Sequence, residues 1–122
     1  MKKHILLIED EEFIAKVYKH FFIKENFTVD SAKNSIIAKK MLKANTPNII
    51  VLDLMLPGES GFKILEKLKA EKKTKHIPVI IISNISLASD IEKCKNLGAI
   101  EYIIKSNFSM REVIDKVHKH IL

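Results

Sequence analysis

Five side chains that can do ionic or phosphoryl chemistry stand at the ends of short apolar runs in this sequence. Glu9 and Asp10 follow the run HILLI, Asp53 follows NIIVL, Ser83 closes PVIIIS and Lys105 follows EYII. If these runs are parallel strands, their ends share one edge of a sheet, and Asp10 and Asp53 lie a few ångströms apart once the first and third strands are neighbours. Carboxylates that close repel one another unless a proton or a cation lies between them. An all-oxygen ligand set with open positions favours Mg²⁺.

The apolar runs themselves predict five strands. Most are continuously apolar and rich in Ile and Val, which is typical of parallel strands covered on both faces. The second run is more polar, which predicts an edge strand. Helical stretches separate the runs, so the sequence predicts an α/β fold of five βα units, (βα)5, with right-handed crossovers onto a parallel sheet. The runs cover residues 4–8, 27–32, 48–53, 78–83 and 101–105.

The stretches between the runs repeat apolar residues at spacings of three and four, which is typical of helices packed on one face. Pro47 predicts the end of the second helix, and Gly98 predicts the end of the fourth. Ser109 and Glu112 form the pattern of a capping box at the start of the fifth helix. The positions that mark the five helices are Phe13, Ile14, Val17, Tyr18, Phe21 and Phe22; Ile36, Ile37, Met41 and Leu42; Phe62, Leu65 and Leu68; Leu87, Ile91, Cys94 and Leu97; and Met110, Val113, Ile114, Val117 and Ile121.

Length and composition predict a single domain over residues 1–122, with no output domain. The chain is 47% hydrophobic, enough for a sizeable core, and its three Gly and three Pro leave no obvious linker. The apolar stretch near the N-terminus is too short for a signal peptide, and no run approaches the ~18 apolar residues of a membrane span. The lone Cys94 cannot form an internal disulfide. We therefore expect a soluble, cytoplasmic protein without membrane insertion.

The charge balance is basic, with 21 Lys and Arg against 15 Asp and Glu and a formal net charge of +6. The lysines are distributed along the chain, mostly where helices would face solvent. The chain has no Trp, and it lacks the interleaved aromatic and basic residues of single-strand nucleic-acid binders. These features favour solvated helix surfaces over direct nucleic-acid binding. The five histidines share no ligand spacing, so no histidine metal site is expected.

The order of these motifs resembles the receiver domain of two-component response regulators. An acidic pair comes first, then a lone Asp in LDLMLPGESG, a Ser after VIII and a Lys after GAIEYII, all at strand ends. The resemblance covers essentially the whole chain. It implies a flavodoxin-like, doubly wound parallel sheet with strand order 2-1-3-4-5.

The resemblance also implies a metal site and a phosphoacceptor. Asp53 would accept a phosphoryl group from a phosphohistidine in a Mg²⁺-dependent reaction. Glu9, Asp10, Asp53 and the backbone carbonyl of Met55 would hold the Mg²⁺, with Asp10 as a direct ligand and Glu9 acting through water. This assignment agrees with the general need of phosphoryl transfer for cations that absorb charge on the phosphoryl oxygens.

Three further residues receive roles from the same resemblance. Ser83 would donate a hydrogen bond to one phosphoryl oxygen, and Lys105 would pair with another. Tyr102 matches the aromatic switch position and would move inward on phosphorylation. The donor would be a sensor histidine kinase or a histidine phosphotransfer protein. A downstream protein would bind the face formed by the fourth helix, the fifth strand and the fifth helix. Such a domain catalyses only its own phosphorylation and dephosphorylation and is not a turnover enzyme.

Some residues also fit structural roles, and two depart from the family pattern. Ser83 alone fits a cap of the fourth helix, Tyr102 fits ordinary packing, and Cys94 fits the core. Ser106 follows Lys105 where most receivers have Pro, and we expect a trans bond there because a cis non-proline bond costs ~2.5–4 kcal/mol. Asn84 stands where Ala or Gly is usual, which bears on the lifetime of the phosphoryl group.

Three other functions compete with this one. A haloacid-dehalogenase-type phosphatase needs a second Asp two residues after the nucleophile, where this chain has Met55. A flavin or nucleotide binder needs hydrogen-bond donors after the first strand, where the chain has EDEE. A degenerate pseudo-receiver, acting as a constitutive interaction module, remains the alternative to the phosphorylated switch.

Overall fold

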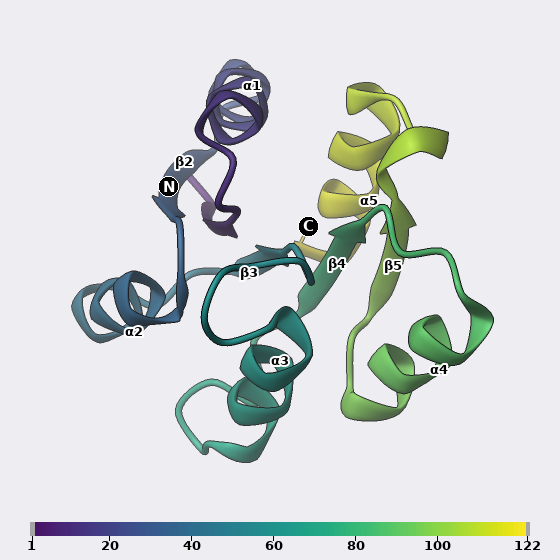
Figure 1. The fold of residues 1–122 in the computed structure, drawn as a ribbon. Coiled ribbons are helices and arrows are strands. Elements are labelled where there is room, and N and C mark those ends of the chain that lie inside the picture. The colour runs from purple at the N-terminus through teal and green to yellow at the C-terminus, as the bar shows by residue number, and fades with distance from the viewer. Residues whose placement is uncertain (1, 122) are drawn as a thin grey trace.

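Five parallel strands form one sheet in the order β2-β1-β3-β4-β5, with helices on both faces (Figure 1). This computed structural model describes residues 2–121. The predicted fold class and strand order are confirmed, and the strand bounds agree with the apolar runs to within one residue. The elements are β1 (His4–Ile8), α1 (Glu12–Lys24), β2 (Thr28–Ala32), α2 (Ser35–Ala44), β3 (Ile49–Leu52), α3 (Gly61–Ala70), β4 (Val79–Ser83), α4 (Ala88–Leu97), β5 (Glu101–Ile104), the 3₁₀ turn η1 (Lys105–Asn107) and α5 (Met110–Ile121).

Two apolar cores lie on the two faces of the sheet. On β1, Ile5 and Leu7 point into the core beneath α1 and α5, and Leu6 and Ile8 point into the core beneath α2, α3 and α4. This alternation follows from the two-residue period of a strand. The central strands β1, β3 and β4 are therefore apolar at nearly every position, whereas β2 lies at an edge, as its polar residues predict. Within residues 2–121, no helix combines the length and apolar character needed to cross a bilayer.

Helix α1 forms as its spacing predicts, but its apolar stripe is wider than the surface it covers. Ala15, Tyr18 and Phe22 are buried against the sheet, whereas Phe13 is 78% exposed and Phe21 also faces solvent. Phe13 lies two residues from Ala15, which places it on nearly the opposite side of a helix with 3.6 residues per turn.

The predicted end of α4 and start of α5 agree with the structure, whereas α2 ends at Ala44, three residues before Pro47. Gly98 follows α4 with φ of 110°, a left-handed conformation that glycine adopts without strain. Ser109 Oγ accepts the Glu112 N–H at 3.3 Å, and Glu112 Oε1 accepts the Ser109 N–H at 3.2 Å. These two bonds complete a capping box at the start of α5. Cys94 is buried in the core, as expected, and burial raises the pKa of its thiol to about 11.

In the connection from β3 to α3, the backbone at Gly61 packs directly against the backbone of Asp53 and Leu54. The Gly61 N–H donates to the Leu54 carbonyl at 2.9 Å. A Cβ at position 61 would lie 2.4 Å from the Asp53 carbonyl oxygen and 2.4 Å from Leu54 Cα. Because both contacts are with backbone atoms, only glycine fits here without moving the segment that carries Asp53.

We therefore expect Gly61→Ala to lower the free energy of unfolding by roughly 2–3 kcal/mol, since backbone atoms must shift to admit the methyl group. Urea denaturation measures the change. Gly58→Ala is the matched control, because position 58 has φ of 75° but no atom within 4 Å of an added Cβ. Gly58→Ala should lower the free energy of unfolding by only about 1 kcal/mol, because alanine is strained in the left-handed conformation. Equal stability of Gly61→Ala and the wild type would contradict the close approach.

Candidate functional site

Neighbouring strands place the acidic residues at one edge of the sheet. Ile8 of β1 pairs with Leu52 of β3, and the Asp53 N–H donates to the Ile8 carbonyl at 3.0 Å. Glu9 and Asp53 are thus the first residues beyond two adjacent parallel strands. The pairing of β1 with β3 is the reason that residues far apart in sequence share one site.

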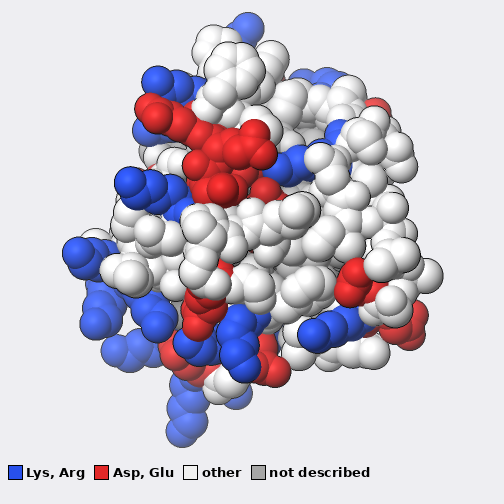
Figure 2. Space-filling model, in the orientation of Figure 1, with Lys and Arg blue, Asp and Glu red and all other residues white. Residues whose placement is uncertain are grey.

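Three carboxylates meet at this edge. Oxygens of Glu9, Asp10 and Asp53 all lie within 4.8 Å of one another. Glu9 and Asp53 are only 3% and 6% exposed, whereas Asp10 is more open to solvent. Figure 2 shows a patch of acidic side chains with basic side chains beside it. This set of hard oxygen donors, open on one side, fits a hydrated divalent cation such as Mg²⁺.

Lys105 is the cation that the protein itself supplies to this cluster. Its Nζ donates to Glu9 Oε1 at 2.8 Å and to Asp53 Oδ2 at 3.0 Å. Burial opposes the charge of Lys105, but the hydrogen bonds to Glu9 and Asp53 outweigh it and raise the lysine pKa. Lys105 is therefore held as an ammonium ion.

The two buried carboxylates are otherwise held by backbone amides. Asp53 Oδ1 accepts the Met55 N–H at 3.1 Å, and Glu9 Oε2 accepts the Glu11 N–H at 3.2 Å. Burial is the largest effect on Glu9 and raises its pKa, and the neighbouring Asp53 acts in the same direction. The hydrogen bond from Lys105 offsets this only in part. Negative charge at Glu9 is consequently unfavourable in the isolated protein.

Ser83 is fully buried at the end of β4, and its position corrects one interpretation from sequence. Its Oγ accepts the Ile85 N–H at 3.2 Å, inside the connection that follows β4. Helix α4 begins only at Ala88, with Leu87 as its N-cap residue. Ser83 therefore does not cap this helix, because the intervening connection is too long. Asn84 is exposed beside it.

Tyr102 ties β5 to the same connection. Its hydroxyl donates to the Ile85 carbonyl at 2.6 Å, and its half-buried ring packs against the core beneath α4. Burial is the largest effect on this phenol and raises its pKa. Tyr102 is thus more than a packing residue, because its hydroxyl and Ser83 Oγ both bind the backbone of Ile85.

The segment after β5 differs from the usual family pattern without unusual backbone geometry. The Lys105–Ser106 peptide is trans, as expected, and Lys105 begins the 3₁₀ turn η1. This turn leaves the lysine ammonium group directed at the acidic cluster.

A hollow to which none of the sequence motifs points opens beside Asp10. It measures about 450 Å³ and includes Lys16, Lys19 and Lys33 among its lining residues, together with Glu9 and Asp10. The spacing of Lys16 and Lys19 on one helix face was a signal for this basic wall, but their closeness to Lys33 depends on the packing of α1 beside β2.

A family model described as the response regulator receiver domain matches residues 5–118. The chain belongs to this family. Receiver domains are signalling domains of two-component systems, so the resemblance inferred from the four motifs is confirmed.

Individual relatives show the same domain in different settings. This receiver is 27% identical over 105 residues to the polar-differentiation response regulator DivK of Brucella anthropi, covering 86% of this chain and 85% of DivK. It is 31% identical over 105 residues to the response regulator PleD of Caulobacter vibrioides, covering 86% of this chain but 23% of PleD. The solved structure of the non-phosphorylated HemR receiver domain from Leptospira biflexa is 30% identical, with a TM-score of 0.88 and coverage of 98% and 94% of the two chains.

We expect Glu9→Gln to stabilise this receiver when divalent cations are absent. The pKa of Glu9 is raised in the folded state, so folding favours the protonated form, and stability is lost as the pH rises above the ordinary value of 4.5. Each unit by which the pKa of Glu9 is raised corresponds to ~1.4 kcal/mol in the free energy of unfolding. The variant should therefore exceed the wild type in free energy of unfolding at neutral pH and match it below pH 4.5.

Urea denaturation in EDTA at the two pH values measures this difference. Glu11→Gln is the matched control, because Glu11 is a neighbouring but exposed acid. A Glu9→Gln protein less stable than the wild type at neutral pH would show that the Lys105 ion pair, rather than burial, dominates at Glu9.

Proposed function

We propose that this receiver accepts a phosphoryl group on Asp53 from a phosphohistidine and signals by a change in protein binding. The observation that carries the proposal is the bond between the Lys105 ammonium and Asp53, inside a cluster of three carboxylates. Three carboxylates and one ammonium leave an excess of negative charge, which a divalent cation can balance. This arrangement supports a cation-dependent reaction at Asp53.

Mg²⁺ is the proposed cofactor. Asp10, Asp53 and the Met55 carbonyl would hold it, with Glu9 acting through water. Bound there, it supplies positive charge to the oxygens of an incoming phosphoryl group. Asp10 is the most open of the three carboxylates, which supports its role as a direct ligand.

In the proposed reaction, an Asp53 carboxylate oxygen forms a bond to phosphorus while the phosphorus–nitrogen bond of the phosphohistidine breaks. The electron pair of that bond stays on the imidazole nitrogen of the donor. Lys105 already lies 3.0 Å from Asp53 Oδ2, so a small movement transfers its hydrogen bond to a phosphoryl oxygen. Ser83 would exchange its contact with Ile85 for another phosphoryl oxygen. Carboxylates serve as covalent phosphoryl acceptors in this way elsewhere.

The donor is proposed to be a histidine kinase or a histidine phosphotransfer protein. Its phosphohistidine is anionic and must approach a negatively charged cluster. The lysines that line the hollow beside Asp10 offset that repulsion and attract the donor. Their positions on α1 and after β2 support an approach from this side.

The output is proposed to pass through Tyr102 to the face formed by α4, β5 and α5. The Tyr102 hydroxyl and Ser83 Oγ both bind the backbone of Ile85, so a change at Ser83 reaches Tyr102 through one short connection. We further propose that the domain acts in the cytoplasm as a protein-binding switch rather than as a turnover enzyme or a direct nucleic-acid binder.

Incubation with acetyl phosphate and Mg²⁺ should add one phosphoryl group, seen as a single increment in intact mass. Asp53→Asn should abolish the increment, because the amide is a poor nucleophile and a poor cation ligand. Asp30→Asn, at an acid of β2 away from the cluster, is the matched control and should label normally. Persistent labelling of Asp53→Asn would exclude Asp53 as the acceptor. No labelling of the wild type would favour the constitutive interaction module.

Asn84→Ala should shorten the lifetime of the phosphorylated protein. Asn84 is exposed next to Ser83, where a larger polar side chain slows the approach of attacking water. The decay of the phosphorylated mass after removal of the donor measures this, with Asn107→Ala as a control at another exposed Asn beyond the strand ends. An unchanged rate would remove Asn84 from the account of phosphate lifetime.

A further inference from the structure

The net charge of the chain resides in one segment. Residues 33–76 contain ten lysines and four acidic residues, a net +6 that equals the charge of the whole chain. One of those four acids is Asp53, in the functional site. The rest of the sequence has eleven basic and eleven acidic residues. Lysines occur along the whole chain, but they outnumber the acidic residues only in this segment.

The fold brings this excess onto one side of the molecule. Lys39, Lys40 and Lys43 are exposed on α2, and Lys63 and Lys67 are exposed on α3. Further exposed lysines follow α3 before β4. In the orientation of Figure 1, α2 and α3 lie at the left and the bottom, and Figure 2 shows basic side chains gathered there. We call this surface the α2–α3 face.

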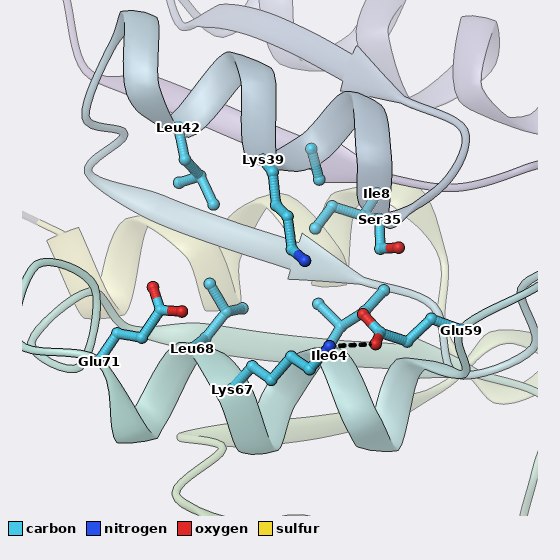
Figure 3. A pocket seen from close by; sticks show the side chains of 10 residues that line it. Ile8, Ser35, Lys39, Leu42, Glu59, Ile64, Lys67, Leu68 and Glu71 are labelled. Carbon is cyan, nitrogen blue, oxygen red and sulfur yellow. Dashed lines mark hydrogen bonds and ion pairs between the residues drawn. The ribbon is translucent and has the colours of Figure 1, made fainter.

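An apolar hollow lies between the two helices of this face. It measures about 40 Å³, which suits the end of one aliphatic side chain, and its lining includes Leu42, Ile64 and Leu68. Lys39 from α2 and Lys67 from α3 stand at its rim, with their amino groups turned toward the same end (Figure 3). The hollow therefore combines an apolar floor with two lysines at one end, and its lining also includes Glu59 and Glu71.

A carboxylate already lies at that rim. Glu59, from the connection between β3 and α3, forms an ion pair with Lys67. The hydrogen bond from Lys67 lowers the pKa of Glu59, and the charge of Lys39 acts in the same direction. The two lysines thus already stabilise one carboxylate beside the apolar hollow.

We propose that the α2–α3 face binds an acidic segment of a partner protein. An aliphatic side chain of that segment enters the hollow lined by Leu42, Ile64 and Leu68. A carboxylate next to it lies between Lys39 and Lys67 and replaces Glu59. This docking site is separate from the phosphoacceptor site and from the α4–β5–α5 face, and it needs no phosphorylation of Asp53.

The chemistry of the face favours a protein segment over other anionic partners. A nucleic acid offers phosphates, which gain nothing from an apolar hollow, and the face has no arginine for bidentate phosphate contacts, since the one arginine of the chain lies on α5. A flat bilayer would meet the protruding lysines before it reached the recessed apolar floor. A second copy of the chain that docked through the same face would oppose lysines with lysines. An acidic segment with an aliphatic side chain satisfies both the rim and the floor.

Binding of fluorescent synthetic peptides to the unphosphorylated full chain tests the proposal. The first probe is a short helical peptide that carries one leucine with glutamates on the turns before and after it. Two matched peptides replace either the leucine with alanine or the glutamates with glutamine. Fluorescence anisotropy should show tight binding of the first probe and clearly weaker binding of both others. Equal binding of either matched peptide would overturn the proposal, because the hollow or the lysine rim would then be unnecessary.

Variants of the protein locate the site. The double variant Lys39→Gln/Lys67→Gln should weaken binding of the first peptide roughly tenfold, from up to about fivefold for each lost charge contact. Lys24→Gln/Lys95→Gln, at exposed helix lysines outside the face, is the matched control and should bind as the wild type does. Glu59→Gln should bind more tightly, because it removes the internal competitor. Thermal melting of each variant establishes that it folds.

Two further probes separate the partner classes. A DNA duplex and phosphatidylserine vesicles should bind more weakly than the first peptide at the same salt concentration. If the duplex or the vesicles bind more strongly than the first peptide, and Lys39→Gln/Lys67→Gln weakens that binding to the same extent, the proposal is overturned in favour of that anion. An equal loss of affinity for the first peptide in the test and control lysine variants would also overturn the proposal. The attraction would then depend on the overall charge of the protein and not on the α2–α3 face.

Discussion

The buried ion pairs of Lys105 with Glu9 and Asp53 are the constraint on which the rest of the structure depends. Two carboxylates almost without solvent contact, with a third beside them, are unfavourable in a folded protein unless positive charge accompanies them. Lys105 supplies only one such charge. The site therefore remains incompletely neutralised, and this residual charge supports the proposed binding of a cation and the proposed phosphorylation of Asp53.

Holding that cluster requires a rigid sheet edge. The carboxylates follow β1 and β3, and the lysine follows β5, so three strands must keep their relative positions to maintain the 2.8 Å and 3.0 Å contacts. The central strands achieve this with apolar residues on both faces, which pack against the helices above and below. Gly61 adds a local constraint, because it lets α3 begin directly against the backbone of Asp53. The two cores are thus the support of the site as well as the source of stability.

Local patterns in the sequence were sufficient for the elements and for the identity of the clustered acids. Apolar runs marked the strands, Gly98 and Ser109 marked helix ends, and the residues just beyond the runs gave Glu9, Asp10 and Asp53. What the sequence could not reveal depends on side-chain direction across long separations. Lys105 binds Glu9, 96 residues away. Ser83 binds the next connection instead of capping α4, because α4 begins only at Ala88. The charge excess of residues 33–76 is visible in the sequence, but the joining of α2 and α3 into one surface is a property of the folded chain.

The connection between β3 and α3 links the two charged regions of the molecule. It begins at Asp53, whose carboxylate is held by Lys105, and it carries Glu59, whose carboxylate is held by Lys67. Each contact pairs one acid of this short connection with one lysine from another part of the chain. An event that withdraws either lysine removes a restraint from the same segment of backbone. The proposed phosphorylation at Asp53 and the proposed docking at the α2–α3 face would therefore act on one structural element from its two ends, although neither would need the other in order to occur.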